Sequence, residues 1–399
     1  MLVLTRRDGL RSEHRIDSVL SREAVFLLNN VVLVGLCFVI FWGTFFPLIS
    51  EAVTGTRASV GPPWFDRYTV PLAIVLVLLS GIGPLVAWRR VTPAGARRSL
   101  GAPALTAAVT AAILFVVPGV AARPAALVLF AVAAFVVAAV AQELTRGVRA
   151  RRAVSGEAVP VALVALVRRN RRRYGGYLVH VGMAVLFVGI SGSTAFQHIR
   201  DARLVPGQTI RVDGYDVRYV RATGNLSRER ISLGAVLEVR REGKHVATLR
   251  PSRGYYPSPD PGEGPIGRFF DGESTSEVGL RAGVRRDVWT AIQPDIAPLR
   301  KLIDDANERF ATSGANVQAL VVAGLVAHYE DKPAPATFRF IVSPLVEWIW
   351  LGGVIVLLGG LIAIWPAAAL AQARAAAARA VARGRGRRDP TAAGTAPSG

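Results

Sequence analysis

Long apolar stretches alternate with arginine-rich segments along most of the chain. Crossing the hydrocarbon core of a bilayer, which is roughly 30 Å thick, takes about 20 apolar residues at the rise of an α-helix. Six stretches meet this requirement, so the pattern predicts a polytopic α-helical membrane protein with six transmembrane helices. The six predicted spans are residues 24–49, 70–88, 104–121, 125–144, 176–196 and 345–366.

A long hydrophilic block, residues 197–344, separates the fifth span from the sixth. Apolar and polar residues alternate in parts of it, as they do along half-buried strands. The alternating segments are 215–219, 237–240 and 338–342. Apolar residues at helical spacing predict a single amphipathic helix that contains Leu299, Leu302, Ile303, Ala306 and Phe310. With a Pro- and Gly-rich loop at 256–265, the block is predicted to be a β-rich, barrel-like domain held by a span at each end.

The distribution of arginine orients the chain, because positively charged loops stay on the cytoplasmic side. The predicted cytoplasmic segments are 1–23, 89–103, 145–175 and 367–399. Both termini are then cytoplasmic, and residues 50–69 and 197–344 lie on the outer face of the inner (plasma) membrane. Within the third basic segment, Val159–Val167 is too short to span and is predicted to be a helix on the membrane surface. The basic tail is expected to be partly disordered.

The composition agrees with a membrane protein, because 51% of the residues are hydrophobic and only 19% are charged. A wholly soluble globule and a disordered chain are therefore excluded. We attribute the net charge of +20 to orientation and lipid attraction, and we expect no nucleic-acid partner. The lone cysteine, Cys37, excludes disulfides within the chain, and the absence of CxxCH excludes covalently attached haem.

His180 is the one histidine that falls inside a predicted span, about one helical turn from its inner end. An ionisable side chain in a span needs a partner that lipid does not supply, so it is a candidate functional residue. Gly176, Ala184 and Ser191 share its helix face, and small residues let a flat group such as haem approach a helix closely. Two interpretations follow from the residues alone. His180 is either a haem ligand or an interfacial histidine hydrogen-bonded to a neighbouring helix.

The other histidines are interpreted as solvated side chains: His14, His198, His245 and His328. No two of them have a spacing typical of a metal site, such as HxxxH. The chain also contains no Walker loop and no GxSxG motif, so no catalytic residue is assigned.

Seven motifs carry a resemblance to a known family. They are Ser21–Asn30, Gly43–Pro47, Ser59–Phe65, Gly81–Leu85, Arg169–Gly182, Leu249–Tyr256 and Pro344–Gly353. In this order, and over almost the whole chain, they resemble the carboxy-terminal part of the CcmF family of cytochrome c haem lyase subunits. The tryptophan-rich WGxxWxWD segment of that family and its flanking histidines do not occur in this sequence. We therefore expect either one half of a split lyase or a truncated reading frame.

The resemblance implies that His180 is an axial ligand of a membrane-embedded haem b, whose opposite ligand belongs to the missing amino-terminal half. It implies a role in cytochrome c maturation, in which haem is attached to apocytochrome c on the outer face of the membrane. The chain is not expected to be active alone.

The implied partners are the amino-terminal half with its tryptophan-rich haem segment, the haem chaperone CcmE, CcmH and CcmI, apocytochrome c and the lipid membrane. An alternative is a membrane-anchored assembly module of the same pathway that binds no haem itself. A transporter is a third interpretation, which no inverted repeat supports.

Overall fold

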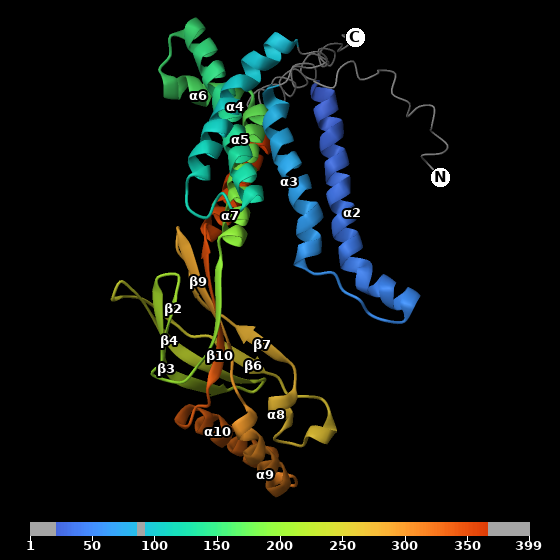
Figure 1. Cartoon of the computed structure of the whole chain (residues 1–399), viewed down its shortest axis with the longest axis vertical. Coiled ribbons are helices and arrows are strands. Elements are labelled where there is room, and N and C mark those ends of the chain that lie inside the picture. The colour runs from blue at the N-terminus through green and yellow to red at the C-terminus, as the bar shows by residue number, and fades with distance from the viewer. Residues whose placement is uncertain (1–20, 86–91, 366–399) are drawn as a thin grey trace, which may run out of the picture. The chain divides into compact units, whose positions relative to one another are not determined.

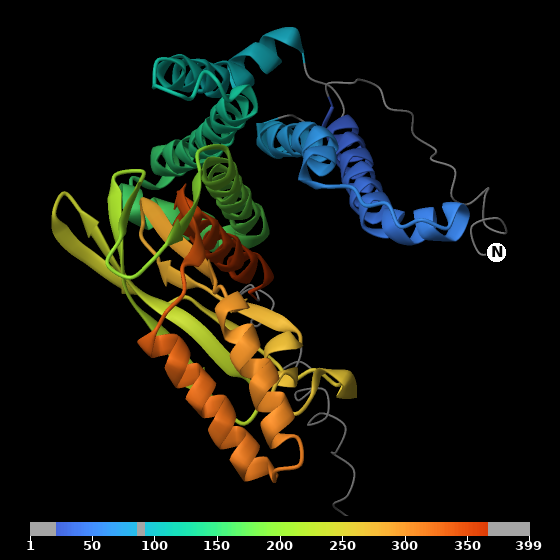
Figure 2. The ribbon, with the colours of Figure 1, turned by 60° about the horizontal axis from the view of Figure 1, so that its bottom comes forward.

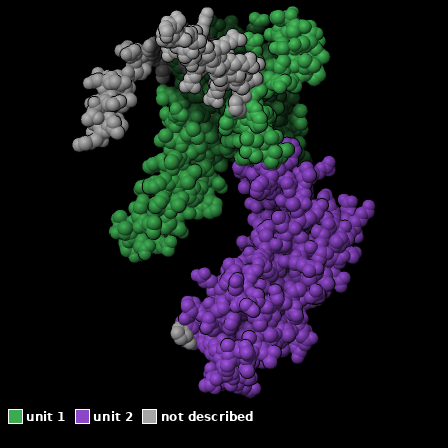
Figure 3. All heavy atoms as spheres, turned by 180° about the vertical axis from the view of Figure 1, so that it is seen from behind, with its two compact units in different colours: residues 1–187, 351–399 green, residues 188–350 purple. Residues whose placement is uncertain are grey.

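The computed structural model describes residues 21–85 and 92–365 of the 399-residue chain. His14 and the predicted basic tail lie outside these residues. The chain divides into two compact units, coloured separately in Figure 3. The helical unit consists of residues 1–187 and 351–399, and the strand-rich unit consists of residues 188–350.

Among the described residues, six helices are long and apolar enough to cross a membrane. They are α2 (Arg22–Thr54), α3 (Pro62–Leu85), α4 (Pro93–Phe115), α5 (Pro124–Ser155), α7 (Arg171–Ala195) and α11 (Val346–Ile364), shown in Figure 1. This confirms the prediction of a six-span membrane protein. The short helix α6 (Val159–Arg169) forms where the surface helix was expected, and its position on the membrane remains a prediction.

Five of the six helices begin before the apolar stretches that predict them, and α11 lies within its predicted stretch. Helix α4 begins at Pro93, where the Thr92 hydroxyl caps it by accepting a hydrogen bond from the Gly95 N–H at 3.2 Å. Helix α5 continues past the predicted end at 144, because arginine and alanine are good helix formers, and it ends at Ser155. Hydrophobicity therefore marks the part that lies in lipid and does not mark the ends of the helices.

Glycines in two of the family motifs are packing positions in the helical unit. A Cβ atom on Gly43 of α2 would lie 2.5 Å from the Phe65 ring and 2.6 Å from the Trp64 ring of α3. A Cβ atom on Gly81 of α3 would lie 2.8 Å from the ring of Phe135 on α5. Neither glycine tolerates a larger residue without movement of an aromatic neighbour.

A seam of glycines joins α7 to α11. Gly175, Gly182 and Gly189 recur every seven residues on α7, and Gly352 and Gly359 do so on α11. A Cβ atom on Gly182 would lie 2.7 Å from the Val356 backbone nitrogen. Helices in lipid associate by close backbone contact, for which small residues at the interface are needed.

The strand-rich unit contains two antiparallel sheets. The four-stranded sheet has the order β1-β10-β9-β8, with β1 (His198–Leu204), β10 (Ala336–Pro344), β9 (Arg286–Gln293) and β8 (Gly279–Arg281). The larger sheet has the order β2-β3-β4-β6-β7, with β5 beside β4. Its strands are β2 (Thr209–Val212), β3 (Tyr215–Leu226), β4 (Ile231–Arg241), β5 (Lys244–Leu249), β6 (Ser252–Tyr255) and β7 (Ser274–Glu277). The β-rich prediction is confirmed, but the described strands form two sheets and not one barrel.

The core of this unit lies between the sheets and two helices, α9 (Arg300–Phe310) and α10 (Ala315–Asp331), which lie side by side in Figure 2. Helix α9 is the amphipathic helix that the sequence predicts, with Ile303 and Ala306 buried. The prediction of a single helix is wrong, because α10 follows it and a four-residue helix, α8 (Arg268–Asp271), precedes it. The predicted loop at 256–265 contains one 3-10 turn, Pro261–Glu263.

Candidate functional site

His180 lies on α7, on the face opposite the glycine seam. Successive residues of an α-helix are about 100° apart, which places Gly182 and Gly189 roughly 180° from His180. The His180 side chain is half-buried. It makes no hydrogen bond or ion pair within residues 21–85 and 92–365. The imidazole is therefore directed away from α11.

Small residues flank His180 one turn away on either side. Gly176 has open space around it, since a Cβ atom there would meet nothing within 4 Å. Ala184 is buried, at 1% exposure, and Phe187 and Ser191 continue the same face. The described part of α7 thus offers an imidazole beside an open helix surface on the Gly176 side, whereas the Ala184 side is covered. An open helix surface next to an imidazole suits a flat aromatic macrocycle held through a ring nitrogen.

A polar cluster holds the adjacent end of α7 against α5. The Arg173 guanidinium donates to Glu143 Oε2 at 2.6 Å and to the Tyr177 hydroxyl at 2.7 Å. It also lies over the rings of Tyr174 and Tyr177, at 5.9 and 5.5 Å from their centroids. The Glu143 side chain is only 12% exposed. These contacts restrain the rotation of α7 about its axis, and Arg173 lies about two turns before His180.

Apolar packing reinforces the same junction of α5, α6 and α7. Tyr174 and Tyr177 are buried and meet edge to face at 5.6 Å, with Val140 beside them. Gly147 of α5 makes room for them, because a Cβ atom there would lie 2.9 Å from the Tyr174 hydroxyl. The sequence pattern did not predict this junction. The signal that could have revealed it was Glu143, a carboxylate at the arginine-rich end of a span.

The other described histidines lie in the strand-rich unit. His198 is on β1, with Nδ1 3.8 Å from Asp213 Oδ2, and this carboxylate also pairs with Arg286 at 2.5 Å. His245 is on β5, within 3.1 Å of the Thr248 hydroxyl. His328 is in the last turn of α10. Within the described ranges, no three His, Cys, Asp or Glu side chains form a group that could hold a metal ion.

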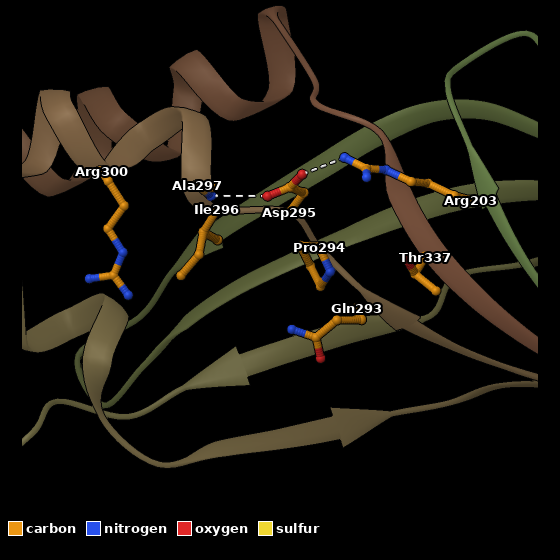
Figure 4. Close-up of a pocket in the computed structure, with 8 residues that line it drawn as sticks. All are labelled: Arg203, Gln293, Pro294, Asp295, Ile296, Ala297, Arg300 and Thr337. Carbon is orange, nitrogen blue, oxygen red and sulfur yellow. Dashed lines mark hydrogen bonds and ion pairs between the residues drawn. The ribbon is translucent and has the colours of Figure 1, made fainter.

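A hollow of about 400 Å³ opens on the strand-rich unit. Figure 4 shows the side chains that line it. It is lined by Arg203, Gln293, Pro294, Asp295, Ile296, Ala297, Arg300 and Thr337. Asp295 accepts hydrogen bonds from Arg203 at 2.7 Å and from the Ala297 N–H at 3.1 Å. Arg300 pairs with Asp271 at 2.5 Å. Both arginines of the hollow are thus paired with carboxylates of the chain, and we assign no cofactor to it.

Comparison with known proteins finds relatives that cover most of the chain, although no family model matches. The cytochrome c-type biogenesis protein CcmF of Pseudomonas aeruginosa is 29% identical over 344 residues, which are 86% of this chain and 44% of that protein. CcmF of Escherichia coli is 26% identical over 373 residues, 91% of this chain and 47% of the relative. The cytochrome c-type biogenesis protein ccl1 of Rhodobacter capsulatus is 30% identical over 278 residues, 69% of this chain and 38% of the relative.

One solved structure has a similar fold. It is a cytochrome c heme lyase, CcmF, which superposes with a TM-score of 0.58 at 22% identity. The match covers 88% of this chain and 46% of that chain. At this identity the similarity shows the fold alone. The chain spans less than half the length of the relatives it matches.

Proposed function

Because the chain is related to the CcmF-type cytochrome c biogenesis proteins, we propose that it is the carboxy-terminal part of a cytochrome c haem lyase. The observation that carries this proposal is the match to CcmF over 86% of the chain. In this function the complete assembly attaches haem to apocytochrome c on the outer face of the membrane. This chain contributes the six spans, His180 and the strand-rich unit, and it is not active alone.

His180 is the axial ligand of a haem b in this proposal. Three features support it: a half-buried imidazole within a span, a bare helix surface at Gly176, and the Arg173 cluster that holds the adjacent end of α7 against α5. When bound, the haem supplies an iron that accepts and releases one electron. The imidazole of His180 would hold the haem through a nitrogen lone pair, and the apolar helix surface around it would exclude water.

The opposite ligand comes from the amino-terminal half, which also carries the tryptophan-rich haem segment. The further partners in this proposal are the haem chaperone CcmE, CcmH and CcmI, and apocytochrome c. Each of these follows from the family resemblance. The membrane is the inner (plasma) membrane, with both termini in the cytoplasm, and the support for this orientation is the arginine distribution.

The test of the ligand is the haem content of the two halves purified as a complex. His180→Ala removes one of two axial nitrogens, so we expect a sharp loss of b-type haem, measured as pyridine haemochrome at equal protein recovery. His198→Ala is the matched control and should retain haem. Added imidazole should restore part of the spectrum of the His180→Ala complex, because it can occupy the vacated position.

Equal haem content in the wild-type and His180→Ala complexes would contradict the ligand assignment. If haem were also absent from the wild-type complex, the alternative function, an assembly module that binds no haem, would replace the proposal. The orientation has its own test. Reporter fusions after Gly243 and in the tail should report opposite sides of the membrane, and the same side for both would overturn it.

A further inference from the structure

The turn between β8 and β9, residues 282–285, projects from the end of the four-stranded sheet and is held in a defined position. We call it the β8–β9 tip. The buried carboxylate of Asp287 accepts a hydrogen bond from the Gly283 N–H at 2.9 Å. The Arg285 carbonyl accepts one from the Leu345 N–H at 3.2 Å. The tip is therefore attached directly to the residue that precedes α11, beside the upper end of β9 in Figure 1.

Leu345 also connects this point to α7. A Cβ atom on Gly192, in the last turn of α7, would lie 2.6 Å from the Leu345 side chain. Leu345 has a φ of 61°, which is unusual for a bulky residue and persists only where the surroundings impose it. The β8–β9 tip, the start of α11 and the end of α7 are thus in contact with one another through Leu345, at one end of the strand-rich unit.

The length of α11 indicates where this contact point lies relative to the membrane. Its 19 residues are about 28 Å long at 1.5 Å per residue, close to the roughly 30 Å of hydrocarbon that it must cross. A helix of this length that crosses the bilayer has its first residue, here Val346, close to one boundary of the hydrocarbon. Trp348 and Trp350 follow, 36% and 72% exposed, where tryptophan side chains favour the interface between lipid and water.

The β8–β9 tip has the composition of a segment that contacts this interface. Val284 is 74% exposed, although it is aliphatic. Arg281 and Arg285 flank it, and neither has an ion-pair partner in the part of the chain that the structure describes. Arg286, by contrast, is paired with Asp213. An exposed aliphatic side chain between two unpaired guanidinium groups suits lipid headgroups, which provide apolar and anionic contacts together.

The outer face of the four-stranded sheet is apolar near the end of α7 and the start of α11, and it is charged further away. One row of residues across all four strands is apolar: Ile199, Ile341, Trp289 and Leu280. Two residues further from α11 on the same face, Asp201 and Arg339 form a bidentate ion pair at 2.8 Å. Only the end of the sheet next to the spans is apolar on its outer face.

We propose that the β8–β9 tip rests on the membrane surface, with Val284 in the interface and Arg281 and Arg285 on the phosphates of phospholipid headgroups. The tip would then be a third attachment of the strand-rich unit to the bilayer, in addition to α7 and α11. The unit could not rotate freely on its two connections, because this contact resists such rotation.

The test places a fluorophore on the tip of the full-length chain in vesicles. In a Cys37→Ser background, Val284→Cys is labelled with an environment-sensitive dye. The matched control is Leu320→Cys on α10, since Leu320 is also aliphatic and also 74% exposed. Vesicles contain phosphatidylcholine and phosphatidylglycerol, with or without a lipid that carries a nitroxide quencher on its headgroup.

We expect blue-shifted emission and loss of most of the fluorescence to the quencher lipid for Val284→Cys, and neither for Leu320→Cys. Removing phosphatidylglycerol should weaken the quenching at the tip, and Arg281→Gln with Arg285→Gln should abolish this lipid dependence. Equal emission and quenching at the two labelled positions would overturn the proposal. Quenching at the tip that does not respond to phosphatidylglycerol would overturn the phosphate contact.

Discussion

Three tyrosine side chains inside the strand-rich unit carry hydroxyl groups without a hydrogen-bond partner among the described residues: Tyr219, Tyr255 and Tyr329. They are 0%, 4% and 1% exposed. Burial raises the pKa of Tyr219 to about 12 and also raises the pKa of Tyr255. The pKa of Tyr329 is raised as well, mainly by burial and in addition by the nearby Tyr219 and Tyr255. The fold therefore favours the protonated phenols strongly.

This cluster predicts instability at alkaline pH. A group whose folded pKa lies above its unfolded value stabilises the fold fully below the unfolded pKa, here 10.0, and loses that contribution as the pH rises. The free energy of unfolding should fall between about pH 10 and pH 12. Denaturant unfolding at several pH values measures it. Tyr219→Phe should make the free energy of unfolding fall less steeply with pH. It should cost little stability at neutral pH, because it removes a hydroxyl without a hydrogen-bond partner among the described residues.

An unchanged slope in Tyr219→Phe would contradict this explanation. The appearance of phenolate absorbance gives an independent check. The absorbance of the buried tyrosines should appear only as the protein unfolds.

Among the helices, the glycine seam between α7 and α11 has the most direct consequence. A methyl group on Gly182 would meet the α11 backbone at Val356 and Gly352, which cannot move aside as a flexible side chain does. We expect Gly182→Ala to destabilise the α7–α11 contact by about 1–3 kcal/mol. Thermal unfolding of the full chain in detergent measures the effect.

Gly360→Ala on α11 is the control, because a Cβ atom there meets nothing within 4 Å. It should leave the melting temperature almost unchanged. A Gly182→Ala protein as stable as the Gly360→Ala protein would show that the seam does not set the distance between the two helices.

The sequence predicts those elements in which buried and exposed positions alternate at a regular interval. Tyr215, Val217 and Tyr219 alternate with exposed residues along β3, so period-two burial reveals the strand. Helix α10 has no comparable signal because its sequence is apolar on most sides: Val322 is buried, yet Leu320 is 74% exposed. Its apolar run is too short to span and has no clear period, so nothing local distinguishes it from a strand.

The candidate site is predictable in part for a similar reason. His180 is conspicuous because an imidazole within an apolar span is rare. The contact between Arg173 and Glu143 joins residues 30 positions apart on different helices, and no periodicity encodes such a pairing. The glycines at intervals of seven were visible in the sequence, but which helix they face is a property of the folded chain.

The two-unit organisation predicts that the strand-rich unit folds without the spans. It has its own core, which includes Phe338, Phe340 and Leu237 at 0% exposure, and domains of roughly 100–150 residues commonly fold alone. A polypeptide of residues 197–344 should be soluble and should unfold cooperatively in denaturant. A non-cooperative transition with a random-coil circular dichroism spectrum would contradict this.

The boundaries matter for that experiment. His198 pairs with Val342 and Leu204 pairs with Ala336, so β1 and β10 are complete only from 198 to 344. A shorter polypeptide, residues 200–339, would cut both strands and would also expose their paired edges. We expect it to be less stable than residues 197–344, which the same denaturant measurement would show.

The position of β10 gives the chain a fixed order of assembly at the membrane. This strand is the last of the unit to leave the ribosome, yet it pairs with both β1 and β9 in the middle of its sheet. If the strand-rich unit lies on the outer face, as proposed, β1 and β9 have no strand between them and their edges stay open until Ala336–Pro344 has crossed the bilayer. Completion of the sheet therefore coincides with entry of α11 into lipid. Nascent chains arrested before Ala336 should be digested by an added protease. Chains released after α11 should be protected, because the sheet is then complete. Translation of the final span would therefore act as the signal that commits the domain to its fold.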